Sequence, residues 1–123
     1  MRYLILAYGD EQKCKALTEE QMRALGKQCT ARDEELKRTG KLVGGGSLGW
    51  TAMSIRPRNG KPIVTDGPYI EAREVVGGFI IVEARDLDEA VQLAQLHPAA
   101  TLGEDLGWGI EVRPFEQCAL PRE

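Results

Sequence analysis

The sequence predicts an α+β domain of the ferredoxin-like type, a β-α-β-β-α-β unit with a β-hairpin inserted after its second strand. Two runs, residues 3–8 and 75–82, are apolar at nearly every position, which is typical of strands buried on both faces. Residues 18–39 and 86–97 begin with capping residues and carry an apolar stripe, as amphipathic helices do. In this fold the first and third core strands are central and the last lies at an edge, and residues 108–113 alternate as a half-buried strand does.

The first helix is expected between residues 18 and 39. Thr18 and Gln21 have the spacing of a capping box, in which each side chain bonds to the backbone N–H of the other residue. Gly40 follows as a C-terminal cap. Apolar residues at helical spacing predict an inward-facing stripe of Met22, Leu25, Cys29 and Leu36.

Glycine is concentrated in residues 41–55, which predict a strand that bends or bulges where another backbone comes close. Because this run lacks the GxxxxGK[ST] spacing and does not open a helix, it does not predict a nucleotide site. Asn59-Gly60 then predicts a hairpin with a type I′ turn. Pro57 and Pro62 flank the turn, and since proline has no N–H to donate, the hairpin is expected at the edge of the sheet.

The second helix begins with another capping box, formed by Asp86 and Glu89. His97 ends this helix, because the proline that follows disfavours helical backbone at the preceding residue. Residues 98–107 are expected to form a loop before the last strand.

One domain is expected over residues 1–115, with a C-terminal tail at 116–123. The chain has 123 residues, of which 42% are apolar and 28% charged, as in ordinary globular domains. A net charge of −3 without a basic stripe gives no sign of nucleic-acid binding, and no apolar run reaches the ~20 residues that cross a membrane. The three cysteines form no CxxC pair and the chain has no HExxH motif. We therefore expect no metal site, no cofactor and a reducing, cytoplasmic location.

The two helices of such a unit cover one face of the sheet, yet apolar side chains are expected on both faces. Monomers rarely expose an apolar patch of that size. At ~25 cal/mol per Å², burying about 800 Å² per subunit would contribute on the order of 10 kcal/mol or more before the cost of association. We therefore expect a homodimer that packs sheet against sheet.

The candidate site is the turn at residues 65–69, which reads Thr-Asp-Gly-Pro-Tyr. Asp66 is either a general acid or base held at the end of a strand, or a turn residue that accepts hydrogen bonds from nearby backbone N–H groups. His97, the only histidine, is either a proton shuttle paired with Asp66 or a residue that interacts with the last carbonyls of its helix. The sequence leaves both alternatives open. Three further residues are candidates for contacts with a ligand: Tyr69, Glu74 and Tyr8. The alternative is that they only pack against neighbours or lie in solvent.

Four segments of the chain, residues 3–10, 64–69, 77–79 and 111–114, occur in the order in which similar segments occur in the YCII-related proteins. The chain resembles the subgroup of that family that is named for its Asp-Gly-Pro-Phe motif. Tyr69 stands where that family usually has Phe, which keeps the aromatic ring and adds a hydroxyl group. The resemblance implies a dimeric α+β barrel.

The same resemblance implies little about the reaction. A His/Asp pair has been proposed as an active site in related proteins, and a related domain takes part in the dechlorination of a chlorinated aromatic. Some members occur beside or fused to extracytoplasmic-function sigma factors. We therefore weigh an enzyme that binds a small organic molecule near Asp66 and uses Asp66 and His97 for acid–base chemistry. The alternatives are a non-enzymatic binding module with an accessory or regulatory role, and a structural dimer without a ligand.

Overall fold

The computed structural model of the chain describes residues 1–120, so the last three residues of the expected tail lie outside the described residues. Among residues 1–120, no helix is long and apolar enough to cross a membrane. The helices are α1 (Glu11–Lys15), α2 (Glu19–Arg38), α3 (Leu87–Ala94) and α4 (Pro98–Thr101), with a 3₁₀ turn η1 (Glu104–Leu106). The strands are β1 (Arg2–Asp10), β2 (Leu42–Ser47), β3 (Met53–Arg58), β4 (Lys61–Asp66), β5 (Glu74–Glu83) and β6 (Gly109–Pro114).

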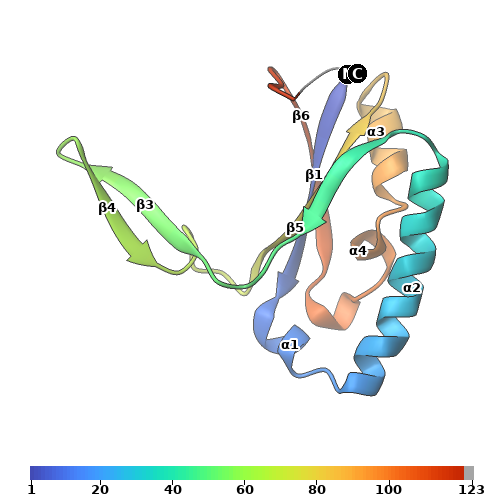
Figure 1. Ribbon diagram of the computed structural model, residues 1–123, viewed down its shortest axis with the longest axis horizontal. Helices are drawn as coiled ribbons and strands as arrows, with labels where there is room; N and C mark the ends of the chain where they lie inside the picture. The colour runs from blue at the N-terminus through green and yellow to red at the C-terminus, as the bar shows by residue number, and fades with distance from the viewer. Residues whose placement is uncertain (121–123) are drawn as a thin grey trace.

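Four strands form one antiparallel sheet in the order β2-β5-β1-β6. This is the strand order of the ferredoxin-like fold, and it confirms the predicted fold class. The two runs that are apolar on both faces, β1 and β5, are the central strands as expected. Figure 1 shows α2, α3 and α4 on one side of this sheet, which leaves its other face without a helix.

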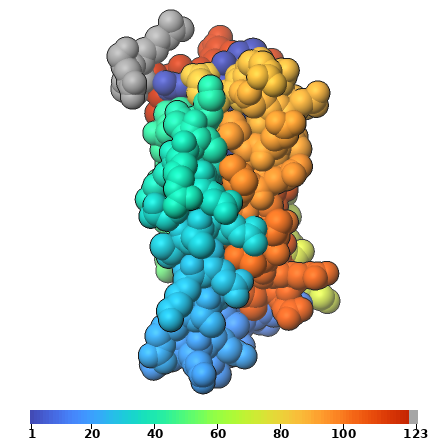
Figure 2. Space-filling model, turned by 90° about the vertical axis from the view of Figure 1, so that its right-hand side faces the viewer, coloured from blue at the N-terminus to red at the C-terminus, as the bar shows by residue number. Residues whose placement is uncertain are grey.

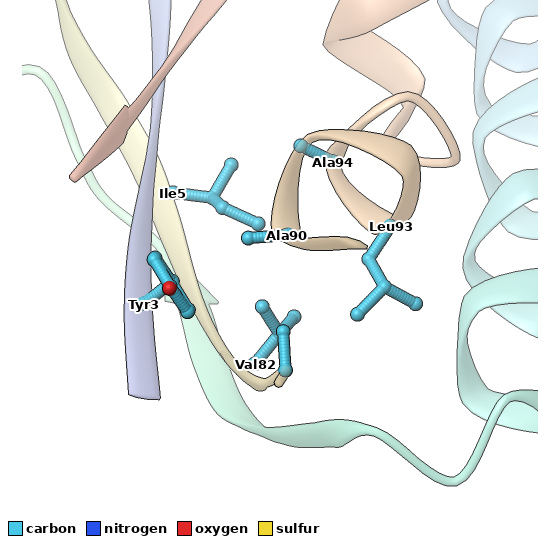
Figure 3. Packing of buried hydrophobic residues seen from close by; sticks show 7 residues of the cluster. Tyr3, Ile5, Val82, Ala90, Leu93 and Ala94 are labelled. Carbon is cyan, nitrogen blue, oxygen red and sulfur yellow. The ribbon is translucent and has the colours of Figure 1, made fainter. Parts of the chain in front are cut away.

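The hydrophobic core lies between α3 and the helix-covered face of the sheet (Figure 3). Cross-strand register places Tyr3 opposite Val82 and Ile5 opposite Ile80, so these side chains point to the same face. Ile5 and Val82 are fully buried there. The core is completed from α3 by three residues at helical spacing, Ala90, Leu93 and Ala94.

The predicted hairpin forms, but its place in the fold differs from the prediction. Asn59 and Gly60 have φ values of 52° and 76°, which are the left-handed conformations that a type I′ turn requires. Strands β3 and β4 pair only with each other, as a separate two-stranded sheet that stands away from the body (Figure 1). Pro57 and Pro62 lie opposite each other in the hairpin, where neither can donate a ladder hydrogen bond. The expectation of an edge position in the main sheet was therefore wrong.

Helix α2 begins as predicted, with both hydrogen bonds of the Thr18–Gln21 capping box in place. Its expected inner stripe is mostly not buried. Only Leu36 is buried in this helix, and the Met22 side chain is 56% exposed. The pattern misled because it assumes contact with the sheet along the whole helix, whereas α2 packs closely only at its C-terminal end.

The segment expected to be a loop, residues 98–107, contains α4 and η1. Pro98 stands in the first turn of α4, where its fixed φ suits a helix start. Gly103 and Gly107 flank η1 with φ values of 71° and 69°, a region that glycine adopts without strain. Helix α3 therefore ends at Ala94 and not at His97 as expected, and His97 and Pro98 begin the next helix.

Candidate functional site

A hollow with a volume of about 530 Å³ lies between the sheet and α2. On the helix-covered side, α2 runs beside the segment that holds α3 and α4 (Figure 2). Arg32 of α2 donates a hydrogen bond to Thr101 of α4, which ties the two elements together at the surface. The lining residues come from β1, α1, α2, β2, β5, the start of α4 and the loops that hold Trp50 and Trp108. The lining residues that carry a hydroxyl, a thiol or a titratable group are Tyr8, Cys14, Cys29, Asp33, Lys37, Ser47 and His97.

Small residues make the floor of the hollow. Gly45 of β2 comes so close to β5 that a Cβ there would overlap the Phe79 carbonyl oxygen and lie 2.9 Å from the Ile80 Cα. A Cβ at Gly78 would lie 3.1 Å from the Gly46 carbonyl oxygen. Because these residues carry no side chain, the strands pair tightly and leave empty the volume that core side chains would fill. The glycine-rich strand thus has the close backbone contact that its sequence predicts.

Two tryptophans form aromatic walls of the hollow. The Trp108 indole packs against Gly9 and Gly103; an added Cβ would overlap the ring at Gly103 and would lie 3.2 Å from its Cδ1 at Gly9. The Trp50 ring lies against Gly77, in contact range of the position a Cβ would occupy. A space between two indoles and a glycine floor accommodates flat apolar groups.

His97 lies at the other side of the hollow, at the start of α4. Its Nδ1 atom accepts a hydrogen bond of 3.0 Å from the Ala99 N–H, so the imidazole acts as an N-cap. This role differs from the expected interaction with the carbonyls of the preceding helix. Burial lowers the pKa of His97, and the negative charge of Asp33 opposes that shift. Since Nδ1 is the acceptor, the neutral ring carries its proton on Nε2.

Three functional groups reach the hollow from α2. Cys29, Asp33 and Lys37 are four residues apart in sequence, which places them along one face of the helix. Burial raises the pKa of the Cys29 thiol, and the carboxylate of Asp33 raises it further. The thiol is therefore held in its protonated, weakly nucleophilic form. Reasoning from the sequence missed Asp33 and Lys37, although their spacing from Cys29 was a signal that could have identified them.

Asp66, the first sequence-based candidate, lies elsewhere. It ends β4 on an exposed part of the hairpin and does not line the hollow that contains His97. The turn around it is held by backbone contacts, because the Gly67 N–H donates to the Ala52 carbonyl and Ser54 Oγ donates to the Gly67 carbonyl. Gly67 has a φ of 99°, so this turn requires glycine. Within one chain, Asp66 and His97 are therefore not brought into one site.

Of the three remaining candidates, Tyr8 lines the same hollow as His97, whereas Tyr69 and Glu74 do not. Arg56 lies 4.0 Å from the Tyr69 ring centroid and donates a hydrogen bond to the Tyr69 carbonyl. The Tyr8 hydroxyl donates a hydrogen bond of 2.8 Å to Glu111, and this bond raises the pKa of Tyr8. Glu74 starts β5 opposite Asp10 and packs beside Gly107.

Comparison with known proteins gives one family and two relatives. The family model described as the YCII-related domain matches residues 1–116. An uncharacterized protein of Rhizobium meliloti (strain 1021) is 32% identical over 97 residues, which are 77% of this chain and 78% of that protein. The 5-chloro-2-hydroxyhydroquinone dehydrochlorinase TftG of Burkholderia phenoliruptrix AC1100, in complex with 2,5-dihydroxybenzoquinone, has a similar fold. It is 18% identical, with a TM-score of 0.50 over 96% of each chain.

Proposed function

The chain belongs to the YCII-related family, and we propose that it binds a small organic molecule in the hollow beside α2 and performs acid–base chemistry on it. The observation that carries the proposal is the hollow itself. It combines a glycine floor and two indole walls with one patch of titratable side chains, which is the common composition of a ligand site.

Asp33 and His97 are the pair proposed to act on the ligand. Both line the hollow, and the Asp33 charge acts on the His97 imidazole. In the proposed step, the Asp33 carboxylate accepts a proton from the ligand. The negative charge that remains on a ligand oxygen is stabilised by a hydrogen bond from the Nε2–H of neutral His97. Asp33 thus takes the place that the sequence-based hypothesis gave to Asp66.

A flat oxygenated ring is the ligand type that suits these surroundings. Two tryptophans can stack on such a ring while the polar patch contacts its oxygen atoms. That the neighbour TftG is in complex with 2,5-dihydroxybenzoquinone supports the choice of this compound as a first probe.

The test combines binding and turnover. Quenching of tryptophan fluorescence by 2,5-dihydroxybenzoquinone and related hydroxylated rings should reveal saturable binding. A turnover assay on the ring that binds should then show a loss in kcat of about 100-fold for Asp33→Asn, with binding retained. Glu34→Gln is the matched control, because its carboxylate is on the same helix but does not line the hollow. Equal activity of Asp33→Asn and the wild type would contradict the proposed role of Asp33.

The second candidate function is a binding module without catalysis, of the accessory or regulatory kind. It is favoured by the bond between His97 Nδ1 and the Ala99 N–H, since a capping histidine already has a structural role. Saturable binding with no change in any bound ring, in wild type and variants alike, would support this module. The three free thiols of residues 1–120 suit a reducing cytoplasm in either case.

A further inference from the structure

Lys37 brings a positive charge to the hollow. It lines the hollow together with Asp33, and both residues belong to α2. The two are one helical turn apart, a spacing at which opposite charges on a helix often pair. Within residues 1–120, however, no ion pair joins the Lys37 ammonium to Asp33 or to any other acid. The ammonium is therefore available to a ligand in the hollow.

The end of α2 does not depend on the Lys37 side chain. A basic residue in the last turn commonly bonds to the last carbonyls of its helix. Here the Leu36 carbonyl accepts hydrogen bonds from the N–H and the hydroxyl of Thr39, and the Lys37 carbonyl accepts one from the N–H of Gly40. Arg38 supplies another basic side chain in this turn and does not line the hollow. Helix capping therefore does not explain the position of Lys37.

The charged residues give the hollow two ends. Asp33 acts on the His97 imidazole, and these two residues make up the acid–base end. Lys37 lies four residues further along α2, which is about 6 Å along the helix axis, and makes up the lysine end. This separation is comparable to the breadth of one aromatic ring with its oxygen substituents. A single flat ring between the two tryptophans can therefore contact both ends.

We propose that Lys37 makes the hollow selective for a flat ring with an ionised oxygen, of the phenolate type, and that it binds this oxygen. The proposal rests on the proposed function, because it names the substrate class of the same hollow. Lysine suits a single ionised oxygen since its ammonium is a compact point charge. The planar guanidinium of arginine, by contrast, matches both oxygens of a carboxylate. A ring phenolate is therefore favoured over a ring carboxylate.

Charge also sets the direction in which the ring binds. The Asp33 carboxylate repels an ionised oxygen, whereas the Lys37 ammonium attracts it. The ionised oxygen therefore lies at the lysine end, and the group that gives up a proton lies at the acid–base end. Because Lys37 is exposed, solvent weakens the attraction, and we expect a preference for the ionised ring of about fivefold, the upper range for an exposed ion pair.

The test uses para-nitrophenol, a ring of this class that ionises near neutral pH and turns yellow when it does. One compound supplies both the neutral and the ionised form, so the comparison leaves the shape of the probe almost unchanged. Absorbance titrations with the full chain, between neutral and mildly alkaline pH, give the Kd of each form. For wild type the ionised form should bind about fivefold more tightly, and this preference should shrink as the salt concentration rises.

Three variants locate the preference at Lys37. Lys37→Met removes the charge and keeps an unbranched side chain, so it should abolish the preference and leave the Kd of the neutral form unchanged. Lys37→Arg keeps the charge and should retain a preference for the ionised form. Lys27→Met is the matched control, because Lys27 is on the same helix and does not line the hollow. Circular dichroism checks the folding of each variant.

The results that would overturn this proposal differ from those that would overturn the proposed function. Equal affinity for the two forms, a preference that does not respond to salt, or a preference that survives in Lys37→Met would refute the role of Lys37 alone. The hollow would then still bind rings. No saturable binding of either form would also refute that role, and if 2,5-dihydroxybenzoquinone fails to bind as well, the proposed function fails with it.

Discussion

The turn at residues 65–69 and the hollow beside α2 contrast in how visible they are in the sequence. The turn is five consecutive residues with an acid, a glycine, a proline and an aromatic ring. In the structure it is an exposed turn at the base of the β3–β4 hairpin, and its glycine adopts a positive φ that other residues rarely adopt. The hollow draws on residues between Ala7 and Trp108, and its titratable groups on α2 and at His97 belong to none of the segments that carry the family resemblance.

This contrast shows that a conspicuous motif and a chemical site need not coincide. Local conformational demands, such as a φ of 99° at Gly67, produce short and recognisable patterns. A binding site is built by tertiary contacts between distant residues, so its members look ordinary one at a time. Substitutions in the hollow and in the turn should therefore differ in their effects on stability, hydrogen exchange and the titration of His97.

The floor of the hollow provides the largest expected effect. Gly45→Ala places a Cβ 2.9 Å from the Ile80 Cα, and the backbone of β5 cannot move away without breaking the sheet. We expect a loss of about 3 kcal/mol in the free energy of unfolding. Gly44→Ala is the matched control, since nothing lies within 4 Å of a Cβ there, and it should change stability by less than about 0.5 kcal/mol. Urea unfolding measures both, and equal effects at the two positions would contradict a tightly packed floor.

The turn should show a smaller and local effect. Gly67→Ala forces a residue with a Cβ into a φ of 99°, which should cost about 1–2 kcal/mol. No atom lies within 4 Å of the added Cβ, so the cost is conformational rather than steric. Hydrogen exchange should show faster opening in β3 and β4 and little change in β1 and β5. Uniform loss of protection across both sheets would show that the β3–β4 hairpin and the four-stranded sheet do not open independently.

His97 gives the hollow a pH dependence. Burial lowers the pKa of His97 in the folded state, so the unfolded chain binds the proton more readily. This contribution to stability is fully present above the unfolded pKa of about 6.5 and is lost as the pH falls through the lower folded value. His97→Asn keeps an N-cap residue and removes the titration, so its stability should fall less between neutral and mildly acidic pH. Urea unfolding at several pH values measures this, and parallel curves for both proteins would count against a buried neutral imidazole.

The smallest effect tests the pairing of Asp33 with His97. The negative charge of Asp33 raises the pKa of His97 against the effect of burial. Asp33→Asn should therefore lower the His97 pKa further, as followed by the imidazole signals in a proton NMR titration. Asp66→Asn serves as the comparison from the turn and should leave the titration unchanged. An equal shift in both variants would mean that the Asp66 carboxylate also acts on His97.

The fold was largely predictable because its signals are local. The Thr18–Gln21 box and the Asn59-Gly60 turn each depend on a few adjacent residues, and both form as predicted. The two strands that are apolar on both faces became the centre of the sheet. The stripe on α2 was misread because the helix packs closely only at its C-terminal end, where Leu36 is buried, and Met22 near its start stays exposed.

The sequence by itself determined the order of elements, their caps and turns, and the family to which the chain belongs. Backbone conformation and side-chain periodicity act over a few residues, so a single sequence contains them in full. Only the tertiary structure decided that a glycine floor and α2 would enclose a hollow and that Asp33 and His97 would share it. It also placed Asp66 at the end of β4 in the hairpin, outside the lining of that hollow. These outcomes depend on the packing of segments far apart in the chain, which no local pattern specifies.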